Sequence, residues 1–453
     1  MSQPAATRND GPDRQALAAS LAGLRAAPDD LAALLECAAQ ARLHGHRRAA
    51  ASALERAALL YPADPRPALG LGDLALEEEG LSADAPMRAA AWYRTALARD
   101  SASAAAHRGL ARLATEAGCG AAAARHAARG FPGHARIRCR SPAHPAAPAV
   151  LLLVAALGGN LPHEAWLDPR RFAITAIHPE YDDPAQPLPA HALIVNAIAD
   201  ADRGGPALLA AARLCARSAA AVINPPARVG ATSRLRIARL AGSVPFCRAP
   251  SITPFAREAP PRGLRFPVLL RAPGFHSGRH FVRVERRAGL AAALAAMPAG
   301  KLLAIEILPS QGGDGRFRKY RVVAIGGRLW PVHLTIADRW KVHDFTAAMA
   351  EDSARGAAAR AEEAAFLADM PAALGPRAMA ALSALSARIG LDYLGIDFAL
   401  AADGSVLLFE ANPAMRLAAA GAEPALAYRQ EPRRAALAAM TALLDRRMAA
   451  RAA

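Results

Sequence analysis

The stretch Asp397-Phe-Ala-Leu-Ala-Ala-Asp-Gly-Ser-Val-Leu-Leu-Phe-Glu-Ala-Asn412 decides the fold of the C-terminal half. Its Asp403-Gly404 pair predicts a tight turn between two strands, because Asp-Gly is a strong hairpin signal. Glu410 and Asn412 are two residues apart and therefore share one face of the second strand. Three oxygen donors that converge among apolar residues suit Mg²⁺. The stretch predicts a magnesium site at Asp397, Glu410 and Asn412, and an ordinary hairpin with polar ends is the alternative.

Upstream of this hairpin, from about residue 261, segments with a strand pattern alternate with segments with a helix pattern. A glycine-containing turn over 274–280 follows its first strand, and Gly326-Gly327 joins a second hairpin. The pattern predicts an α+β domain over residues 261–450. Its strands are expected at 266–271, 302–308, 321–325, 328–333, 395–400 and 405–410, and its helices at 286–297, 351–369, 376–389 and 431–448.

Apolar runs with a helix between them predict a separate α/β layer over residues 149–260. The expected strands are 150–154, 172–177, 192–195 and 220–223, and the expected helix is 205–218. Residues 131–148 contain four prolines and predict a loop-like linker before this layer.

Residues 13–130 have a helical pattern that repeats. Gly45, Gly80 and Gly118 each follow a helical segment, and they are 35 and 38 residues apart, from 80 − 45 and 118 − 80. The segments that begin at Leu54 and Tyr93 are alike, and each is followed by a Gly-Leu pair. A period of about 34 residues is typical of tetratricopeptide repeats, which the segment resembles. An irregular Ala-rich helical bundle is the alternative.

The composition limits the classes of function. The 453 residues suggest about two to four domains. The formal net charge of +16 is interpreted mainly as general surface charge, and an anionic ligand such as a nucleotide is a candidate. No RNA- or DNA-binding motif accompanies the charge, so we expect no nucleic-acid partner. The five cysteines are scattered, which argues against zinc and a disulfide framework. No signal peptide or membrane-spanning run is visible, and a soluble, cytoplasmic protein is expected.

The order of these segments resembles the ATP-grasp fold, in the branch that holds glutathione synthetases and ribosomal-protein glutamate ligases. The Asp…Glu-x-Asn arrangement closes the domain in that family. Phe266-Pro-Val-Leu-Leu-Arg271 with its glycine turn is similar to the family's phosphate-binding strand and loop. Asn224-Pro-Pro and Thr232-Ser-Arg234 resemble the end of the domain that precedes the family's ATP-binding module. The resemblance implies an α/β pre-ATP-grasp domain followed by an ATP-grasp domain, after a helical repeat solenoid.

The same resemblance implies which residues form the site. Two positions depart from the family pattern: Arg271 stands in place of its Lys, and Lys319 in place of the acid of a D-x-R motif. The three lysines of the chain, Lys301, Lys319 and Lys341, all lie in this region. The expected ATP contacts are Arg271, Gly274, His276, Gly278, Glu306, Ile307, Leu308 and Lys319; the expected catalytic residues are Arg321, Lys341 and His343; the expected metal ligands are Asp397, Glu410 and Asn412.

The implied function is that of an ATP-dependent carboxylate–amine ligase, which works through an acyl phosphate with one or two Mg²⁺ ions or with Mn²⁺. The expected substrate is a small molecule, peptide or protein, and the helical repeats are expected to hold a protein partner. Two alternatives stay open. One is a non-catalytic scaffold with a degenerate ATP-grasp module, and the other is a phosphotransferase on the same fold.

Overall fold

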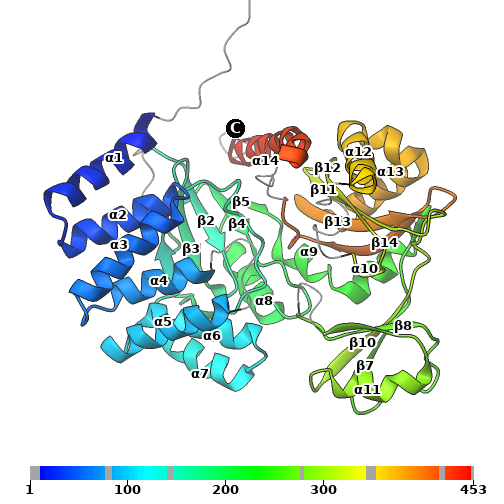
Figure 1. Ribbon diagram of the computed structural model, residues 1–453, viewed down its shortest axis with the longest axis horizontal. Coiled ribbons are helices and arrows are strands. Elements are labelled where there is room, and N and C mark those ends of the chain that lie inside the picture. The colour runs from blue at the N-terminus through cyan, green and yellow to red at the C-terminus, as the bar shows by residue number, and fades with distance from the viewer. Residues whose placement is uncertain are drawn as a thin grey trace, which may run out of the picture. The chain divides into compact units, whose positions relative to one another are not determined.

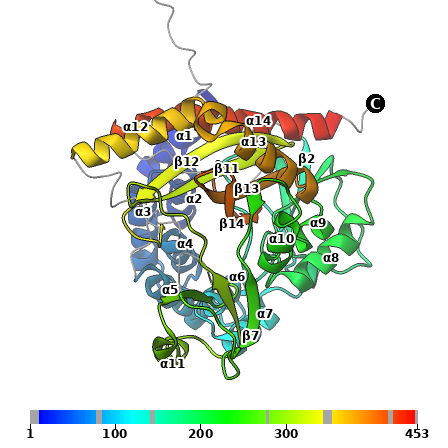
Figure 2. The ribbon, with the colours of Figure 1, turned by 90° about the vertical axis from the view of Figure 1, so that its right-hand side faces the viewer.

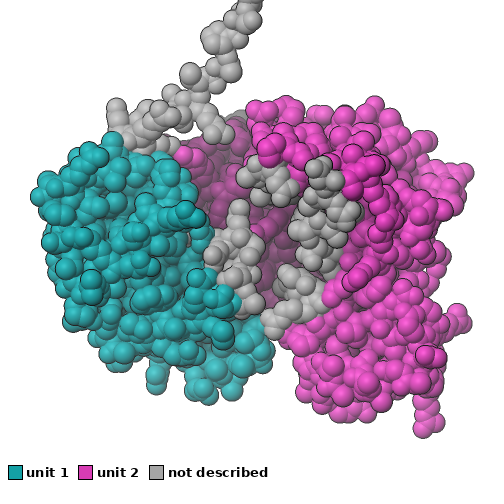
Figure 3. Space-filling view, in the orientation of Figure 1, with its two compact units in different colours: residues 1–135, 156–158 teal, residues 136–155, 159–453 magenta. Residues whose placement is uncertain are grey.

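The computed structural model describes residues 11–76, 84–139, 146–275, 280–342, 353–417 and 424–449 (Figure 1). The chain divides into two compact units, which Figure 3 colours separately. The first unit comprises Met1–Ala135 with Ala156–Gly158, and the second comprises Arg136–Ala155 with Gly159–Ala453.

The first unit consists of helices in its described residues. Neighbours along the chain pack on each other: α2 on α3, α4 on α5 and α6 on α7. Small alanines fill most of the buried positions, which allows the helix axes to approach closely. The helices are α1 (Gly11–Ala26), α2 (Leu31–Leu43), α3 (Arg47–Leu60), α4 (Arg66–Leu76), α5 (Ala85–Arg99), α6 (Ala104–Glu116) and α7 (Gly120–Gly130).

Two glycines explain the repeated Gly-Leu pairs of the sequence. A Cβ atom on Gly70 would lie 2.8 Å from Cδ2 of Leu54, and one on Gly109 would lie 2.5 Å from the Tyr93 ring. Both pairs are separated by 16 residues, from 70 − 54 and 109 − 93. The two segments therefore occupy equivalent places in successive helix pairs. Gly45 and Gly118 have φ of +78° directly after α2 and α6, and Gly80 lies outside the described residues.

The second unit begins with a five-stranded sheet in the order β1-β3-β2-β4-β5. Strands β2 to β5 pair in parallel and β1 pairs antiparallel with β3. Its strands are β1 (Arg136–Arg138), β2 (Ala149–Leu153), β3 (Ala173–Ile177), β4 (Leu193–Asn196) and β5 (Ala221–Ile223), and its helices are α8 (Gly205–Cys215), α9 (Pro226–Gly230) and α10 (Arg234–Ala241).

The loop expected over residues 131–148 is partly wrong, because β1 lies inside it. Arg136 aligns with Ile177 on β3, and its guanidinium Nε donates to Asp182 at 2.6 Å. A strand of three residues is too short to produce a periodic pattern, and the prolines around it conceal it.

A four-stranded antiparallel sheet follows in the order β7-β10-β8-β9. Helix α11 packs on it through Leu290, which contacts the core around Leu270 and Leu302. The helix expected over 286–297 is shorter, because its first turn is a 3₁₀ helix at Arg287–Gly289. The elements are β7 (Ile252–Ala256), β8 (Val268–Arg271), β9 (Phe281–Val284), α11 (Leu290–Ala295) and β10 (Lys301–Glu306).

The last sheet has the order β12-β11-β13-β14-β6 and contains both predicted hairpins. Helices α12 and α13 cover one face of this sheet (Figure 2). Phe366 and Leu382 on these helices pack with Phe398 on β13. Gly375, with φ of +77° before Pro376, kinks α13. The elements are β6 (Cys247–Arg248), β11 (Phe317–Ile325), β12 (Arg328–Ala337), α12 (Ala354–Ala368), α13 (Met370–Ile389), β13 (Tyr393–Leu400), β14 (Val406–Asn412), the 3₁₀ helix Pro424–Arg429 and α14 (Gln430–Ala449).

Within the described ranges, no helix combines the length and the apolar character needed to cross a membrane.

Candidate functional site

One row of polar residues runs across four strands of the last sheet. His333 on β12 aligns with Arg321 on β11, Arg321 aligns with Asp397 on β13, and Asp397 aligns with Glu410 on β14. The register shifts between Asp397 and Phe398, so that Phe398 aligns with Leu408 and Phe409 forms a bulge. This row lies on the face opposite α12 and α13, since the neighbouring Phe398 is in their core. The bulge therefore decides that the two carboxylates stand side by side.

Arg321 and Asp397 form a two-pronged ion pair in the middle of this row. Nε and Nη2 of Arg321 donate to Oδ1 and Oδ2 of Asp397 at 2.6 and 2.7 Å. Nζ of Lys319 lies 3.8 Å from the same carboxylate. Burial lowers the pKa of Lys319, and Asp397 opposes this shift in part. Burial also acts to lower the pKa of Arg321, but Asp397 outweighs it and the pKa is raised.

Glu410 is held from the parallel-sheet layer by Arg234, the first residue of α10. Nη2 of Arg234 donates to Oε1 of Glu410 at 2.6 Å, and Nη1 donates to the carbonyl of Phe409 at 3.1 Å. The Ser233 hydroxyl accepts from the Arg236 amide and begins the helix at this point. Burial acts to raise the pKa of Glu410, but Arg234 and Arg271 outweigh it, so the pKa is lowered.

An open pocket lies beside this ion pair, within the second unit, and encloses about 710 Å³ of empty space that includes adjoining solvent. It is bordered by the parallel-sheet layer, by the four-stranded antiparallel sheet and by β14 of the last sheet. The polar side chains that line the pocket include carboxylates, one amide and two guanidinium groups. The lining residues that matter here are Asp202, Arg234, Arg271, Gly274, Glu410 and Asn412.

Arg271, at the end of β8, is the second cation of the pocket. Its Nη2 donates to the carbonyl of Phe275 at 2.9 Å, and its guanidinium lies 5.4 Å from the centre of the Phe281 ring. Burial and the nearby Arg234 lower the pKa of Arg271 to about 10, against the opposite effect of Glu410. The two guanidinium groups offer contacts to an anionic ligand, and the carboxylates of Asp200, Asp202 and Glu410 line the same pocket.

The turn after Arg271 requires a glycine at position 274. Gly274 has φ of +78°, and a Cβ there would lie 1.8 Å from Cδ of Arg203. Nη1 of Arg203 donates to the Gly274 carbonyl at 2.7 Å. The turn is therefore fixed to the loop after β4. His276 and Gly278, which continue the expected phosphate loop, lie outside the described residues.

The expected adenine-binding segment lies at the end of β10. Oε1 of Glu306 accepts from Nη2 of Arg248 at 2.6 Å, and Oε2 accepts from the Ser251 amide at 2.9 Å. The hydrogen bond from the Ser251 amide lowers the pKa of Glu306. Burial acts in the opposite direction, and Arg248 adds to the lowering. Leu308 is buried against Ala399 and Leu407. Glu306, Ile307 and Leu308 are not among the residues that line the pocket.

Two further expected catalytic residues follow β12. Lys341 is exposed. His343 lies outside the described residues.

The residues present fit a divalent cation in part. Glu410 and Asn412 both line the pocket, and oxygen donors of this kind suit Mg²⁺, which usually keeps waters and phosphates as its other ligands. Asp397 does not line the pocket, and both its oxygens are bound by Arg321. In the described part of the chain, no group of three or more His, Cys, Asp and Glu side chains could hold a metal ion.

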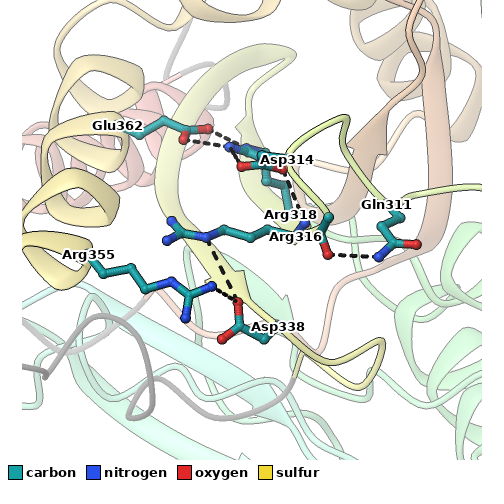
Figure 4. Close-up of polar contacts among 8 residues, drawn as sticks. Gln311, Asp314, Arg316, Arg318, Asp338, Arg355 and Glu362 are labelled. Carbon is teal, nitrogen blue, oxygen red and sulfur yellow. Dashed lines mark hydrogen bonds and ion pairs between the residues drawn. The ribbon is translucent and has the colours of Figure 1, made fainter.

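A second network fixes the start of β11, as Figure 4 shows. Arg318 donates through Nε and Nη2 to Glu362 on α12 at 2.6 and 2.9 Å, and through Nη1 and Nη2 to Asp314 at 3.0 and 2.8 Å. Nη2 of Arg355 donates to Asp338 at 3.1 Å. These contacts tie the loop before β11 to α12, and so hold the strand that carries Lys319 and Arg321.

The sequence did not assign a role to three pocket residues, Asp200, Asp202 and Arg234. Asp200 and Asp202 follow β4, at the carboxyl edge of the parallel sheet. Ligands of open α/β sheets bind outside this edge, which is the signal that could have indicated them. The contact between Arg234 and Glu410 joins segments 176 residues apart and leaves no local pattern.

Comparisons with known proteins found distant structural likenesses only. No protein-family model matches the chain, and no curated protein matches it. The RimK domain protein ATP-grasp from Sphaerobacter thermophilus is 16% identical, with a TM-score of 0.39, over 65% of this chain and 98% of that one. The VanG D-Ala:D-Ser ligase from Enterococcus faecalis is 12% identical, with a TM-score of 0.37, over 65% and 99%. The N5-carboxyaminoimidazole ribonucleotide synthetase from Thermotoga maritima is 12% identical, with a TM-score of 0.34, over 59% and 68%.

Proposed function

We propose that the second unit is an ATP-grasp module that uses Mg-ATP to join a carboxylate to an amine. The observation that supports this most directly is the pocket in which Arg234 and Arg271 lie beside Glu410 and Asn412. Two guanidinium groups and two oxygen donors in one pocket are the combination that a metal-bound polyphosphate requires.

Electrostatics explains why such a pocket suits this reaction. The terminal phosphate and the carboxylate to be activated are both anions, so cations must hold them together. Phosphoryl transfer spreads negative charge over the phosphate oxygens, and catalysis consists mainly of positioning and of stabilising that charge. Magnesium, when bound, neutralises part of it. Arg271 would contact the phosphates. Arg271, Arg234 and the turn at Gly274 line the same pocket, so positive charge lies near that turn.

The remaining roles extend this proposal to the neighbouring strands. Lys319 and Arg321 would face the transferred phosphate from β11, with Lys341 and His343 after β12. The loop that contains His276 and Gly278 would cover the phosphates. The segment Glu306-Ile307-Leu308 would take the adenine and ribose.

The substrate class remains a small molecule, a peptide or a protein. We propose that the first unit is a tetratricopeptide-like solenoid that recruits a peptide or protein. The structural support is the equivalence of the Leu54–Gly70 and Tyr93–Gly109 contacts, because the same packing recurs between successive helix pairs.

The test of the proposed function is a nucleotide titration of the full chain, with and without Mg²⁺, followed by a search for ADP and phosphate release with candidate carboxylates and amines. Wild type should bind ATP only when Mg²⁺ is present. Glu410→Ala should lose the Mg²⁺-dependent binding of ATP, because it removes an oxygen donor from the pocket.

The matched control is Glu431→Ala on α14, which is an exposed acid paired with Arg434 and should bind ATP as wild type does. A well-folded wild type that binds no nucleotide at any Mg²⁺ concentration would contradict the proposal. Phosphorylated product without amide formation would instead support the phosphotransferase alternative.

A further inference from the structure

We infer that Arg203 is a positioning residue of the pocket, and that it holds the turn at Gly274 in the conformation that receives an anionic ligand. The inference rests on the proposed function and deepens it, because it gives a role in nucleotide binding to a residue outside the lining of the pocket. Arg203 lies between β4 and α8 in the parallel-sheet layer, and Gly274 lies after β8 of the four-stranded sheet.

The contact between Arg203 and Gly274 combines a hydrogen bond with close packing. Nη1 of Arg203 donates to the Gly274 carbonyl at 2.7 Å. A Cβ atom on Gly274 would lie within 2.7 Å of Cδ, Nε and Cγ of Arg203, so the arginine stem occupies the space that any side chain at position 274 would need. The contact joins segments 71 residues apart and therefore fixes the turn from outside its own sheet.

Arginines bind two successive carbonyl groups of this turn. Arg203 binds that of Gly274, and Nη2 of Arg271 donates to that of Phe275 at 2.9 Å. A carbonyl oxygen carries partial negative charge and repels a phosphate, and a guanidinium bound to it offsets that charge. Because the peptide group is planar and trans, the carbonyl that faces Arg203 turns the amide of Phe275 to the opposite side. Amides, and not carbonyls, are what a turn offers to an anion.

The loop that carries Arg203 is itself held by Asp200. Oδ1 of Asp200 accepts from the amides of Asp202 and Arg203 at 2.9 and 3.0 Å. The Asp200 carbonyl accepts from the Gly204 amide at 2.8 Å, and the Asp200 amide donates to the carbonyl of Gly159 at 3.0 Å. The arginine therefore extends to the turn from a backbone that two loops of the parallel sheet hold in place.

A turn that is already in place loses less freedom when a ligand binds, and this gain in affinity is the effect to be measured. We expect Arg203→Ala in the full chain to weaken binding of a non-hydrolysable Mg-ATP analogue about three- to tenfold, which corresponds to one net hydrogen bond. Isothermal titration calorimetry measures the affinity. Arg203 is exposed, so the variant should fold, and urea unfolding checks this.

Two further variants separate the contact from the charge. Arg203→Lys keeps the positive charge and a donor, and it should recover most of the affinity. Arg213→Ala is the matched control, because it removes one positive charge from an exposed residue on α8 of the same layer, and it should bind the analogue as wild type does.

Hydrogen–deuterium exchange without nucleotide measures the turn directly. Peptides that cover residues 270–275 should exchange faster in Arg203→Ala than in wild type, whereas peptides of α13 should not change. This measurement needs no ATP, so it tests the contact separately from the proposed function.

A double variant tests whether Arg203 and Gly274 act together. Gly274→Ala should also weaken binding of the analogue, because the new methyl group would displace the Arg203 side chain. The losses in Arg203→Ala and Gly274→Ala should not add in the double variant, since both substitutions remove the same contact.

An Arg203→Ala variant that binds the analogue as wild type does, or that leaves exchange over residues 270–275 unchanged, would overturn the inference. An equal loss in Arg213→Ala, an Arg203→Lys variant as weak as Arg203→Ala, or additive losses in the double variant would also overturn it. A wild type that binds no analogue would instead remove the proposed function, and faster exchange in Arg203→Ala would then still show that Arg203 holds the turn.

Discussion

Arg234 on α10 donates to Glu410 on β14 at 2.6 Å, so a helix of the parallel-sheet layer neutralises an acid of the last sheet. The Arg234 side chain is 15% exposed and that of Glu410 is 36% exposed. The pair links the parallel-sheet layer to the strand that carries the proposed metal ligands. A ligand that binds Glu410 would have to compete with Arg234.

Replacing Arg234 by Gln should therefore destabilise the protein at neutral pH, by about 1–3 kcal/mol for a half-buried pair. The pKa of Glu410 is lowered in the folded state, so its contribution to stability is present above its ordinary pKa of 4.5 and is lost as the pH falls through the folded-state value. The loss of stability caused by Arg234→Gln should shrink as the Glu410 carboxyl is protonated.

Urea unfolding at pH 7 and pH 3.5 measures both effects. Arg239→Gln, which changes an exposed residue on the same helix, is the control. A deficit that is equal at both pH values would contradict this account.

Glu363→Ala should be among the most destabilising substitutions in the second unit. Glu363 is fully buried and accepts hydrogen bonds from Arg429, at 2.7 and 3.0 Å, and from Tyr428. Its removal leaves the Arg429 charge buried without its carboxylate, which costs about 3–5 kcal/mol. Chemical denaturation measures the loss. The exposed Glu431→Ala, from a pair on α14, should cost about 0.5 kcal/mol or less; similar losses in both variants would show that burial is not the cause.

Gly109→Ala should test the packing between α5 and α6. The new methyl group would meet the Tyr93 ring at 2.5 Å, and overpacking of this kind costs about 1–3 kcal/mol. Gly23→Ala on α1 is the control, because its Cβ would meet no atom within 4 Å and Ala favours a helix by about 0.5–1 kcal/mol. Thermal unfolding followed by circular dichroism should show opposite shifts of the midpoint. A stabilised Gly109→Ala variant would contradict the described contact.

His333 should make stability depend on pH near neutrality. Burial, followed by Arg321 and Lys319, lowers its pKa well below 6.5. The unfolded chain therefore binds a proton below pH 6.5 that the folded chain does not, and stability falls as the pH falls. Compared with His333→Gln, wild type should lose up to about 1.4 kcal/mol more per pH unit below pH 6.5. Urea titrations from pH 7 to pH 5 measure the two slopes, and parallel slopes would contradict the prediction.

Local patterns were enough to predict most strands and helices of the second unit. The Asp403-Gly404 turn and its two strands are present, with β13 and β14 paired antiparallel. Such elements are readable because turn chemistry and alternation act within a few residues. The short strands β1 and β6 have two or three residues and provide too little pattern to be recognised.

The sequence by itself determined that Asp397, Glu410 and Asn412 would lie on one hairpin, because the Asp403-Gly404 turn joins their strands, and that Glu410 and Asn412 would share a face, because strand faces alternate. Only the tertiary structure decided what each acid contacts. The bulge at Phe409 sets the register, Arg321 arrives from the next strand to bind Asp397, and Arg234 arrives from a segment 176 residues away to bind Glu410. The physical reason is that the charge state and the partner of a carboxylate depend on the groups around it in space, which no spacing along the chain specifies.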